Sequence, residues 1–448
     1  MQIDHNIFKA YDIRGTYPDQ INERVCSLIG WAFAEFLSDA TGPIVVGRDM
    51  REDSGEMAKA FIQGAASRGR EVVDLGLITT DMMYFATGYL DAAGGAMITA
   101  SHNPGQYNGI KLSGAQAQPI GIETGLVEIQ NMSMQLDVAV IEHVGTIIKR
   151  DLGEWWVDHV LSLVSAGQWP KFKVAIDAGN GMAGQIVPIF AKNVPLIITP
   201  LYFELDGTFP HHLANPAIDA NLVDLIKAVK SGQLDFGLAF DGDGDRVYFV
   251  DETGQPLTAS VLAAILAQDL LKKNPGAPVL YDLRMSKIMP EAISAAGGQA
   301  IRTPVGGAHI RPALKKHDGV MAAEGVGHFY FRDNYYSDSG LLAAALAIDI
   351  LARSGKKLSE LAQPFRKYFH SGELSFDVAD PKATIEKIAI AHTGGKQDRL
   401  DGLTVDYGTW WFNLRASHTE PLVRLNVEAN NQDTMEQKCQ ELEQLIKT

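Results

Sequence analysis

Short apolar runs alternate with longer amphipathic stretches along residues 1–150 of this chain. Turn-forming or polar residues flank each run, as is typical of buried strands. A helix ending near Ser67 is expected after the first run, with Asp53 and Glu56 placed as a capping box. Strands separated by helices indicate a mostly parallel sheet. The apolar runs are residues 44–46, 72–73 and 95–98.

The same alternation predicts two further blocks of similar size. In residues 151–252, helices are expected over 152–166 and 219–229, and strands over 174–176 and 236–240. In residues 253–363, strands are expected at 278–280 and 319–323, with helices over 258–272, 286–295 and 340–353. Ser339 is placed to cap the last of these helices.

The pattern changes after about residue 364. Strand-like stretches at 403–407, 410–414 and 422–427 precede an amphipathic helix over 433–446. The order of strands and then a helix indicates a small α+β unit. We therefore expect an α/β protein with three similar mixed α/β-sheet domains (1–150, 151–252 and 253–363) and a smaller C-terminal α+β domain (364–448) around a central cleft.

Composition narrows the class of protein. The chain has 448 residues, 46% of them hydrophobic and 21% charged, which is typical of a globular protein with an ample core. A net charge of −15 argues against general binding to nucleic acid or anionic membranes, so an anionic substrate would need a local basic cluster.

Cysteine usage and the chain start favour a cytoplasmic enzyme. Cys26 and Cys439 form no metal or redox motif, as expected in a reducing compartment. No basic region precedes an apolar core at the start, so no signal peptide is expected. The longest apolar stretch, 341–352, is interrupted by Asp349 and is too short to span a bilayer.

The first candidate site is the segment 99–104, which holds Ser101 and His102, with Lys111 further on. It follows the apolar run 95–98, and Asn-Pro-Gly at 103–105 forces a turn there. A hydroxyl, an imidazole and an ammonium within about ten residues could supply a nucleophile or phosphoryl carrier with proton-transfer groups. Taken alone, the segment could equally be a helix N-cap or a plain turn.

The second candidate is the loop 241–246, in which Asp241, Asp243 and Asp245 alternate with glycines before Arg246. Small spacers let three carboxylates converge on one hard cation such as Mg²⁺. An EF-hand loop, ending at Glu252, is the alternative. Arg246 opposes it, because that loop needs glycine at this position, and the flanking residues favour strands over helices.

Three further segments carry polar groups at expected element ends. Arg415, Ser417, Thr419 and Arg424 combine guanidinium and hydroxyl donors that match the oxygens of a phosphate. Glu324, with His328 four residues later, follows an expected buried strand, where its carboxylate could accept sugar hydroxyls or be purely structural. Glycines at 306–307, before His309, could begin an anion-binding helix.

Four of these motifs occur in a fixed order, one in each block of the chain. In this combination the chain resembles the phosphohexomutases over essentially its whole length, and among them it is most similar to the bacterial phosphomannomutases. The carrying motifs are 99–104 with Lys111, 241–246, 324–328, and 415–421 with Arg424. Segments 8–15, 273–277, 282–284, 330–333 and 338–340 also resemble that branch.

The resemblance implies a role for each matching residue. Ser101 would be carried as a phosphoserine, bound to one Mg²⁺ that Asp241, Asp243 and Asp245 hold. Arg246 would assist at the same phosphate. Lys111 and His102 would support transfer, with Lys111 preferred as the proton-transfer partner.

The implied substrate is a hexose phosphate, with hexose 1,6-bisphosphate as intermediate and activator. Arg415, Ser417, Thr419 and Arg424 would hold the phosphate that is not reacting. The sugar would lie against residues that the resemblance places in the cleft: Tyr11, Arg14, Arg284, Glu324 and His328. Closure by the last domain would exclude water from the phosphoserine.

We expect interconversion of mannose 6-phosphate and mannose 1-phosphate, feeding sugar-nucleotide synthesis. The alternatives are a phosphoglucomutase or phosphoglucosamine mutase, a non-catalytic sugar-phosphate-binding protein, and a magnesium-dependent phosphatase. Two departures from the family pattern bear on the choice. Val326 replaces a serine common in the sugar loop, and Gly307 stands where mannomutase relatives often carry a histidine, with His309 two residues later. The oligomeric state, monomer or dimer, stays open.

Overall fold

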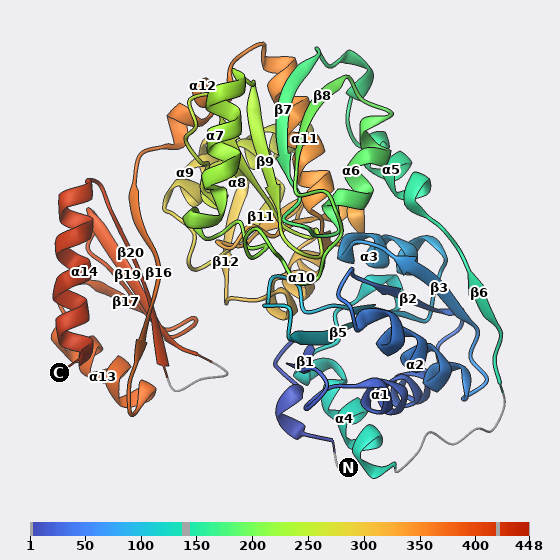
Figure 1. Ribbon diagram of the computed structural model, residues 1–448. Coiled ribbons are helices and arrows are strands. Elements are labelled where there is room, and N and C mark those ends of the chain that lie inside the picture. The colour runs from blue at the N-terminus through green and yellow to red at the C-terminus, as the bar shows by residue number, and fades with distance from the viewer. Residues whose placement is uncertain (1–2, 137–143, 418–421, 448) are drawn as a thin grey trace.

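The computed structural model describes residues 3–136, 144–417 and 422–447. Four β-sheets follow one another along the chain, and helices cover them (Figure 1). The first three sheets form a contiguous body, and the fourth stands beside it, joined by the segment that leads into strand β16 (Figure 1). This is the expected architecture of three mixed α/β units and a smaller last one.

The first sheet has the strand order β1-β5-β4-β2-β3-β6. Its four strands from β4 to β6 are parallel, and β5 and β1 add to one edge in antiparallel fashion. The strands are β1 (Ile13–Thr16), β2 (Ile44–Arg48), β3 (Val72–Leu77), β4 (Gly94–Ile98), β5 (Tyr107–Gly114) and β6 (Ile147–Lys149). The helices are α1 (Glu23–Phe36), α2 (Ser54–Ala66), α3 (Thr80–Tyr89) and α4 (Leu126–Gln135).

The second sheet has the order β10-β9-β7-β8, and only the edge strand β10 is antiparallel. Its strands are β7 (Phe172–Asp177), β8 (Leu196–Leu201), β9 (Phe236–Phe240) and β10 (Val247–Asp251). Its helices are α5 (Gly153–Ser162), α6 (Ala183–Ala191) and α7 (Val223–Gly232), the last preceded by a 3₁₀ turn at Asp219–Leu222.

The third sheet has the order β12-β11-β13-β14-β15 and is parallel only from β12 to β13. Its strands are β11 (Pro278–Asp282), β12 (Gln299–Thr303), β13 (Met321–Ala323), β14 (Phe329–Phe331) and β15 (Ser337–Asp338). Its helices are α8 (Ala259–Lys273), α9 (Ile288–Ala295), α10 (Gly307–Lys316), α11 (Gly340–Ser354) and α12 (Leu358–Ala362).

The fourth sheet, β16-β20-β19-β18-β17, is antiparallel throughout. Its strands are β16 (Phe369–Asp377), β17 (Lys396–Asp398), β18 (Leu403–Asp406), β19 (Trp410–Ala416) and β20 (Leu422–Ala429). Helices α13 (Pro381–Ala391) and α14 (Gln432–Lys447) pack on it. We call residues 369–447 the C-terminal domain.

Two local expectations can be compared with the helix starts. Ser339 caps α11 as expected, because its side chain accepts from the backbone N–H of Leu342. The capping box at Asp53 and Glu56 was wrong: the Asp53 side chain makes no capping bond, and its Oδ2 accepts from Asn108 Nδ2 at 3.0 Å. Asp53 therefore ties helix α2 to strand β5, a distant partner that local spacing does not reveal.

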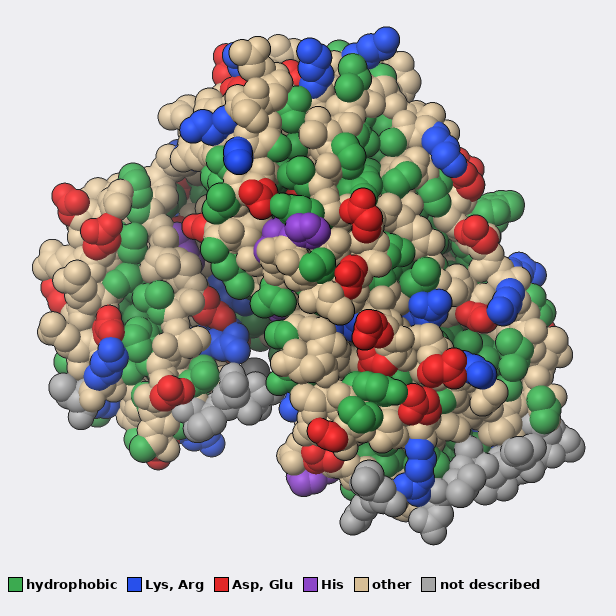
Figure 2. All heavy atoms as spheres, viewed as in Figure 1, with side chains coloured by type: hydrophobic (Ala, Val, Ile, Leu, Met, Phe, Trp, Pro, Cys, Tyr) green, Lys and Arg blue, Asp and Glu red, His purple; other side chains and the backbone are tan. Residues whose placement is uncertain are grey.

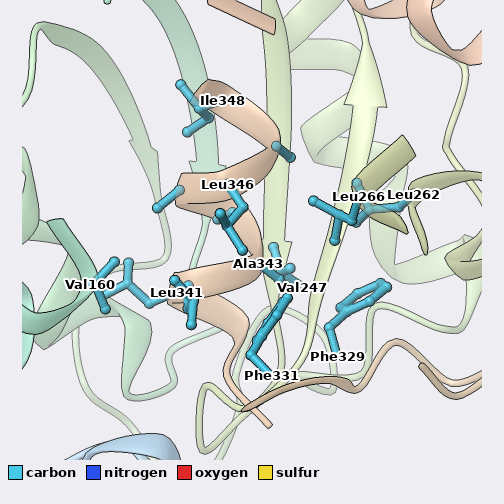
Figure 3. Close-up of a cluster of buried hydrophobic side chains, with 14 of the residues drawn as sticks. Val160, Val247, Leu262, Leu266, Phe329, Phe331, Leu341, Ala343, Leu346 and Ile348 are labelled. Carbon is cyan, nitrogen blue, oxygen red and sulfur yellow. The ribbon is translucent and has the colours of Figure 1, made fainter. Parts of the chain in front are cut away.

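The hydrophobic cores separate the last domain from the other three. One continuous cluster runs from the first sheet through α5 and α11 to the second and third sheets. Figure 3 shows its centre, where Leu341 and Leu346 of α11 lie among Val160, Val247 and Phe331. The C-terminal domain has its own cluster, formed by residues between Ile385 and Ile446. Within the described ranges, no helix is long and apolar enough to cross a membrane.

Candidate active site

Ser101 lies just after strand β4, at the edge of the first sheet that faces the second domain. Its φ is +51°, a left-handed conformation that is uncommon for a residue other than glycine. The backbone N–H of Ser101 donates to Thr99 Oγ1 at 2.8 Å, which stabilises the turn. Only 3% of the residue is exposed. The protein thus holds one hydroxyl in a fixed, costly backbone conformation, as is typical of reacting groups.

Arg51, which the sequence reasoning missed, stabilises this turn by hydrogen bonds. Its side chain is fully buried, and its Nε donates to Asp49 Oδ2 at 3.2 Å. The remaining N–H groups donate to backbone carbonyls of the serine loop, at Ser101 (2.9 Å), Asn103 (2.6 Å), Pro104 (2.9 Å) and Tyr107 (2.8 Å). All five guanidinium donors are therefore used. An arginine two residues after an Arg-Asp pair at a strand end was the available signal.

The Ser101 hydroxyl meets groups from its own loop and from the second domain. It donates to Asp241 Oδ2 at 2.9 Å, and Arg246 Nη2 donates to it at 3.0 Å. His102 Nδ1 lies 3.1 Å from the same oxygen and also contacts Arg246 Nη2. The two loops touch so closely that a Cβ at Gly242 would lie 2.5 Å from the Ser101 carbonyl oxygen. The geometry therefore brings together Ser101, His102, Asp241 and Arg246.

The acidic loop forms the floor of this cluster. One carboxylate oxygen from each of Asp241, Asp243 and Asp245 lies within 4.8 Å of the others, and all three residues are buried. Asp243 Oδ1 has no hydrogen-bond partner among the described residues, and Asp245 Oδ1 has only longer charged contacts, with His328 Nε2 at 3.4 Å and Arg246 Nε at 3.8 Å. Buried carboxylate oxygens with this spare acceptor capacity fit a hard divalent cation such as Mg²⁺.

Strands flank this loop on both sides, since Val247 of β10 pairs with Phe240 of β9 in antiparallel register. The EF-hand alternative requires helices on both sides and is therefore excluded. Lys111 reaches the loop from β5, and its Nζ lies 2.7 Å from Oδ2 of both Asp243 and Asp245. Lys111, which the sequence grouped with the serine segment, thus contacts the acidic loop and supplies one positive charge to it.

Burial and neighbouring charges shift the pKa values in this cluster. Burial, with repulsion from Asp245, raises the pKa of Asp241 to about 7. Burial would lower the pKa of Lys111, but Asp243 and Asp245 hold it well above its ordinary value. Burial and the Arg246 charge hold the pKa of His102 well below its ordinary value. At neutral pH the site therefore presents a neutral imidazole beside the serine and a charged ammonium against Asp243 and Asp245.

The third domain adds Glu324 at the end of β13. Gly306 N donates to its Oε1 at 2.9 Å, and Tyr330 Oη donates to its Oε2 at 2.6 Å. His328 Nδ1 lies 3.0 Å from the same Oε2, and its Nε2 lies 3.4 Å from Asp245 Oδ1. Both oxygens of Glu324 thus have protein partners, and a sugar hydroxyl would share them. His328 connects the sugar loop to the acidic loop.

Tyr11 and Arg14 approach from the start of the chain. Tyr11 Oη donates to the Val305 carbonyl at 3.2 Å, and the Tyr11 ring lies edge-on to His309 with centroids 6.1 Å apart. Arg14 Nη1 donates to Asn103 Oδ1 at 2.6 Å, within the serine loop. Tyr11 thus contacts the start of α10, and Arg14 contacts the serine loop.

The expected phosphate-binding residues lie in the C-terminal domain. Arg415 of β19 and Arg424 of β20 are directly paired across the sheet. Ser417 follows β19, and its N–H donates to the Leu422 carbonyl at 2.9 Å. Thr419 lies outside the described residues. We call Arg415, Ser417 and Arg424 the C-terminal phosphate clamp.

Glu373 of β16 was missed by the sequence reasoning. Its Oε2 lies 2.7 Å from Arg415 Nη2, and its Oε1 lies 2.8 Å from Arg424 Nη1. Arg284 of the third domain also approaches Glu373 Oε2, at 3.8 Å, while its Nε donates to Asp282 Oδ2 at 2.9 Å. The space-filling view shows the surface hollowed between the C-terminal domain and the body (Figure 2).

The four domain models of the phosphoglucomutase/phosphomannomutase family match, in order: the alpha/beta/alpha domains I, II and III at residues 5–134, 154–254 and 259–368, and the C-terminal domain at 373–445. The chain belongs to this family, and it is an enzyme of the phosphohexomutase class, an isomerase.

Relatives of nearly equal length support this assignment. The chain is 39% identical to "phosphohexose mutases" of Xanthomonas campestris pv. campestris (strain B100), over 98% of this chain and 99% of that protein. It is 35% identical to a phosphomannomutase of Salmonella montevideo, over 98% of both chains. A crystal structure of a phosphoglucomutase/phosphomannomutase family protein from Burkholderia thailandensis superposes with a TM-score of 0.91 at 28% identity, covering 99% of this chain and 98% of that one.

Proposed function

We propose that this enzyme interconverts mannose 6-phosphate and mannose 1-phosphate through a phosphoserine at Ser101 and a hexose 1,6-bisphosphate intermediate. The observation that carries the proposal is that Ser101 Oγ contacts Arg246 and Asp241 of the acidic loop, while Arg415 and Arg424 lie together on a separate domain. One set of residues would serve the reacting phosphate and the other the distant phosphate. Curated relatives named phosphomannomutase support the choice of mannose.

The transfer step needs no reactant other than the phosphoserine and the sugar hydroxyl. The bond between phosphorus and Ser101 Oγ breaks, a bond between phosphorus and the sugar hydroxyl oxygen forms, and the hydroxyl proton ends on Ser101 Oγ. The bisphosphorylated sugar then turns, and Ser101 takes the other phosphoryl group by the reverse step. Catalysis of this kind depends on positioning and charge stabilisation, which Arg246 provides directly at the serine oxygen.

Asp241, Asp243 and Asp245 would hold Mg²⁺, which when bound offsets the negative charge that the phosphoryl group carries. The residues around them handle the protons. Lys111, charged beside Asp243 and Asp245, would pass a proton to the Ser101 oxygen as the phosphoryl group leaves and take one from the sugar hydroxyl, and the reverse step would return it the same way. His102 lies 3.1 Å from Ser101 Oγ with a neutral imidazole, so it would orient the serine hydroxyl as a hydrogen-bond partner.

The C-terminal phosphate clamp would bind the second phosphate and bring the C-terminal domain toward the serine. The separate core of that domain supports this movement, because a rigid body with its own core can rotate without repacking the others. Water excluded by closure could not hydrolyse the phosphoserine. The proposal also includes domain limits at 1–150, 151–252, 253–363 and 364–448 and a cytoplasmic location.

Glucose and glucosamine phosphates are the competing substrates, because the sugar-contacting loop departs from the family pattern. Val326 offers no hydroxyl beside Glu324. A Cβ at Gly307 would lie 3.1 Å from Tyr330 Oη, so a side chain there would crowd the Glu324 network. His309 packs on Tyr11 near the same point, and we do not assign it the role of the missing histidine.

The test is a coupled isomerase assay on the purified enzyme with Mg²⁺ and a trace of hexose bisphosphate. Mannose, glucose and glucosamine 1-phosphates are compared in parallel. The proposal expects the highest kcat/KM for mannose 1-phosphate and its loss in Ser101→Ala. Ser165→Ala, at a serine of the second domain outside the site, is the matched control. A higher kcat/KM for another sugar phosphate would reassign the substrate. Binding of hexose phosphates without isomerisation would overturn the proposed mutase activity.

A further inference from the structure

Glu373 is a negative charge inside a site proposed to bind a dianion. Its carboxylate bridges Arg415 and Arg424 at 2.7 and 2.8 Å, with 22% of the side chain exposed. Burial would raise its pKa, but the Arg415 and Arg284 charges lower it to about 2, so it is ionised at neutral pH. A phosphate held by the same guanidinium groups would meet this charge.

Part of the carboxylate's role is structural. Arg415 and Arg424 are direct cross-strand partners on one face of the sheet, and like charges in that arrangement repel. Glu373 lies on the neighbouring strand β16, where it pairs with Asn426, two residues from Arg424. Its position offsets the repulsion and aligns one edge of each guanidinium group.

One further donor on each of these arginines is unused. The Nε atoms of Arg415 and Arg424 are buried and have no hydrogen-bond partner in the part of the chain that the structure describes. The Arg415 side chain is 5% exposed, so an unpaired donor on it is costly. Glu373 therefore takes some of the donors of the C-terminal phosphate clamp while other donors are unused.

Charge counting shows the effect on a bound phosphate. Two arginines and Glu373 sum to one positive charge, so a phosphate dianion would leave the group with one negative charge in excess. Without Glu373, the two arginines would balance the dianion. Arg284 does not change this count, because Asp282 lies against it and Glu324 Oε1 lies 3.6 Å from it.

We infer that Glu373 is a counter-charge built into the C-terminal phosphate clamp. It keeps the affinity of the clamp for phosphate low enough for the bisphosphorylated sugar to dissociate from the clamp and turn. The inference rests on the proposed function, in which the same intermediate must present first one phosphate and then the other to Ser101. Glu373 acts through the arginines and is a positioning residue. A clamp without it would bind phosphate more tightly and turn over more slowly.

The test compares inorganic phosphate binding by wild type, Glu373→Gln and Glu373→Ala, using calorimetric titration of the full chain. Both variants are expected to bind phosphate about fivefold more tightly, near the low end of coupling between charged sites because the group is partly exposed. Asp377→Asn is the matched control: it removes a negative charge from the same strand at an exposed position and is expected to leave binding unchanged.

Steady-state kinetics supply the second readout. Tighter binding with slower release predicts that Glu373→Gln lowers KM and kcat together, while Asp377→Asn leaves both unchanged. Weaker phosphate binding, or a raised KM, in both variants would overturn the inference, because it would make Glu373 only an anchor for the arginines. If Glu373→Ala does not fold, the result for Glu373→Gln decides the test, because that variant keeps the side-chain volume.

The binding experiment separates this inference from the proposed function. Tighter phosphate binding by the variants of a protein that isomerises no hexose phosphate would refute the mutase and leave the counter-charge standing. Isomerisation by the wild type with weaker phosphate binding by both variants would refute the counter-charge alone.

Discussion

Replacing Arg51 with lysine should show how much the serine loop depends on one guanidinium group. Arg51 is fully buried and uses all five of its N–H donors, on Asp49 and on four carbonyls of the loop. A lysine ammonium has three donors, so at least two of these acceptors would lose their partner. Lysine keeps the charge, which isolates the loss of the fork geometry.

The magnitude follows from the two unpaired acceptors. A buried polar group without a partner costs about 1–3 kcal/mol, so Arg51→Lys should destabilise the first domain by about 2–6 kcal/mol. At about 2 °C or more per kcal/mol, its Tm should fall by at least about 4 °C. A misplacement of about 1 Å at Ser101 would also lower kcat by about a hundredfold.

Differential scanning calorimetry and the isomerase assay measure the two effects. Arg70→Lys is the control, because Arg70 also donates to backbone carbonyls, at Ala40 and Gly42, but away from the serine loop. It should change Tm only slightly and leave kcat unchanged. An Arg51→Lys enzyme with a Tm and kcat close to wild type would refute the view that this fork positions Ser101.

Three further predictions concern the acidic loop, the sugar loop and the C-terminal phosphate clamp. Asp243→Asn should abolish Mg²⁺ binding in calorimetric titration and activity with it, because it removes a buried carboxylate of the triad. Val326→Ser should raise kcat/KM for the preferred hexose 1-phosphate by up to about tenfold, the worth of one hydrogen bond. Glu373 has a pKa lowered to about 2, so its stabilisation is present above pH 4.5 and lost as pH falls toward 2. Thermal scans over that range should show the C-terminal domain of Glu373→Gln losing less stability than that of wild type.

The sequence predicted the elements whose pattern is local. Strands such as β9 were found because their whole length is apolar, and α11 because Ser339 caps a long apolar helix. Strands β1 and β5 were missed. β5 runs on from the serine turn, and its alternation is broken by two polar residues: Asn108, which ties the strand to α2, and Lys111, which contacts the acidic loop of the site. Function thus hides the structural pattern there.

The candidate site was predictable where the residues that form it are adjacent in sequence. Asp241, Asp243 and Asp245 share one loop, so their spacing alone indicated a cation. Arg51 and Glu373 act on residues about 50 positions away, and each resembles an ordinary charged residue in its own segment. Only the pairing of β16 with β20 places Glu373 beside Arg424. Tertiary pairing therefore determines which charges belong to the site.

The interface of the C-terminal domain supports the proposed role of its charges in turnover. Beyond its own core, this domain meets the third domain through polar contacts: Lys287 Nζ lies 2.6 Å from Asp406 Oδ1, and Val305 N donates to Asp401 Oδ2 at 3.2 Å. The first of these is a partly exposed ion pair, which contributes about 0–1 kcal/mol, so it could break and re-form in the proposed domain movement. Arg284 links this interface to the clamp through Glu373. If the proposed function holds, a change of one charge at Glu373 should therefore alter both the binding of phosphate and the closure of the domain.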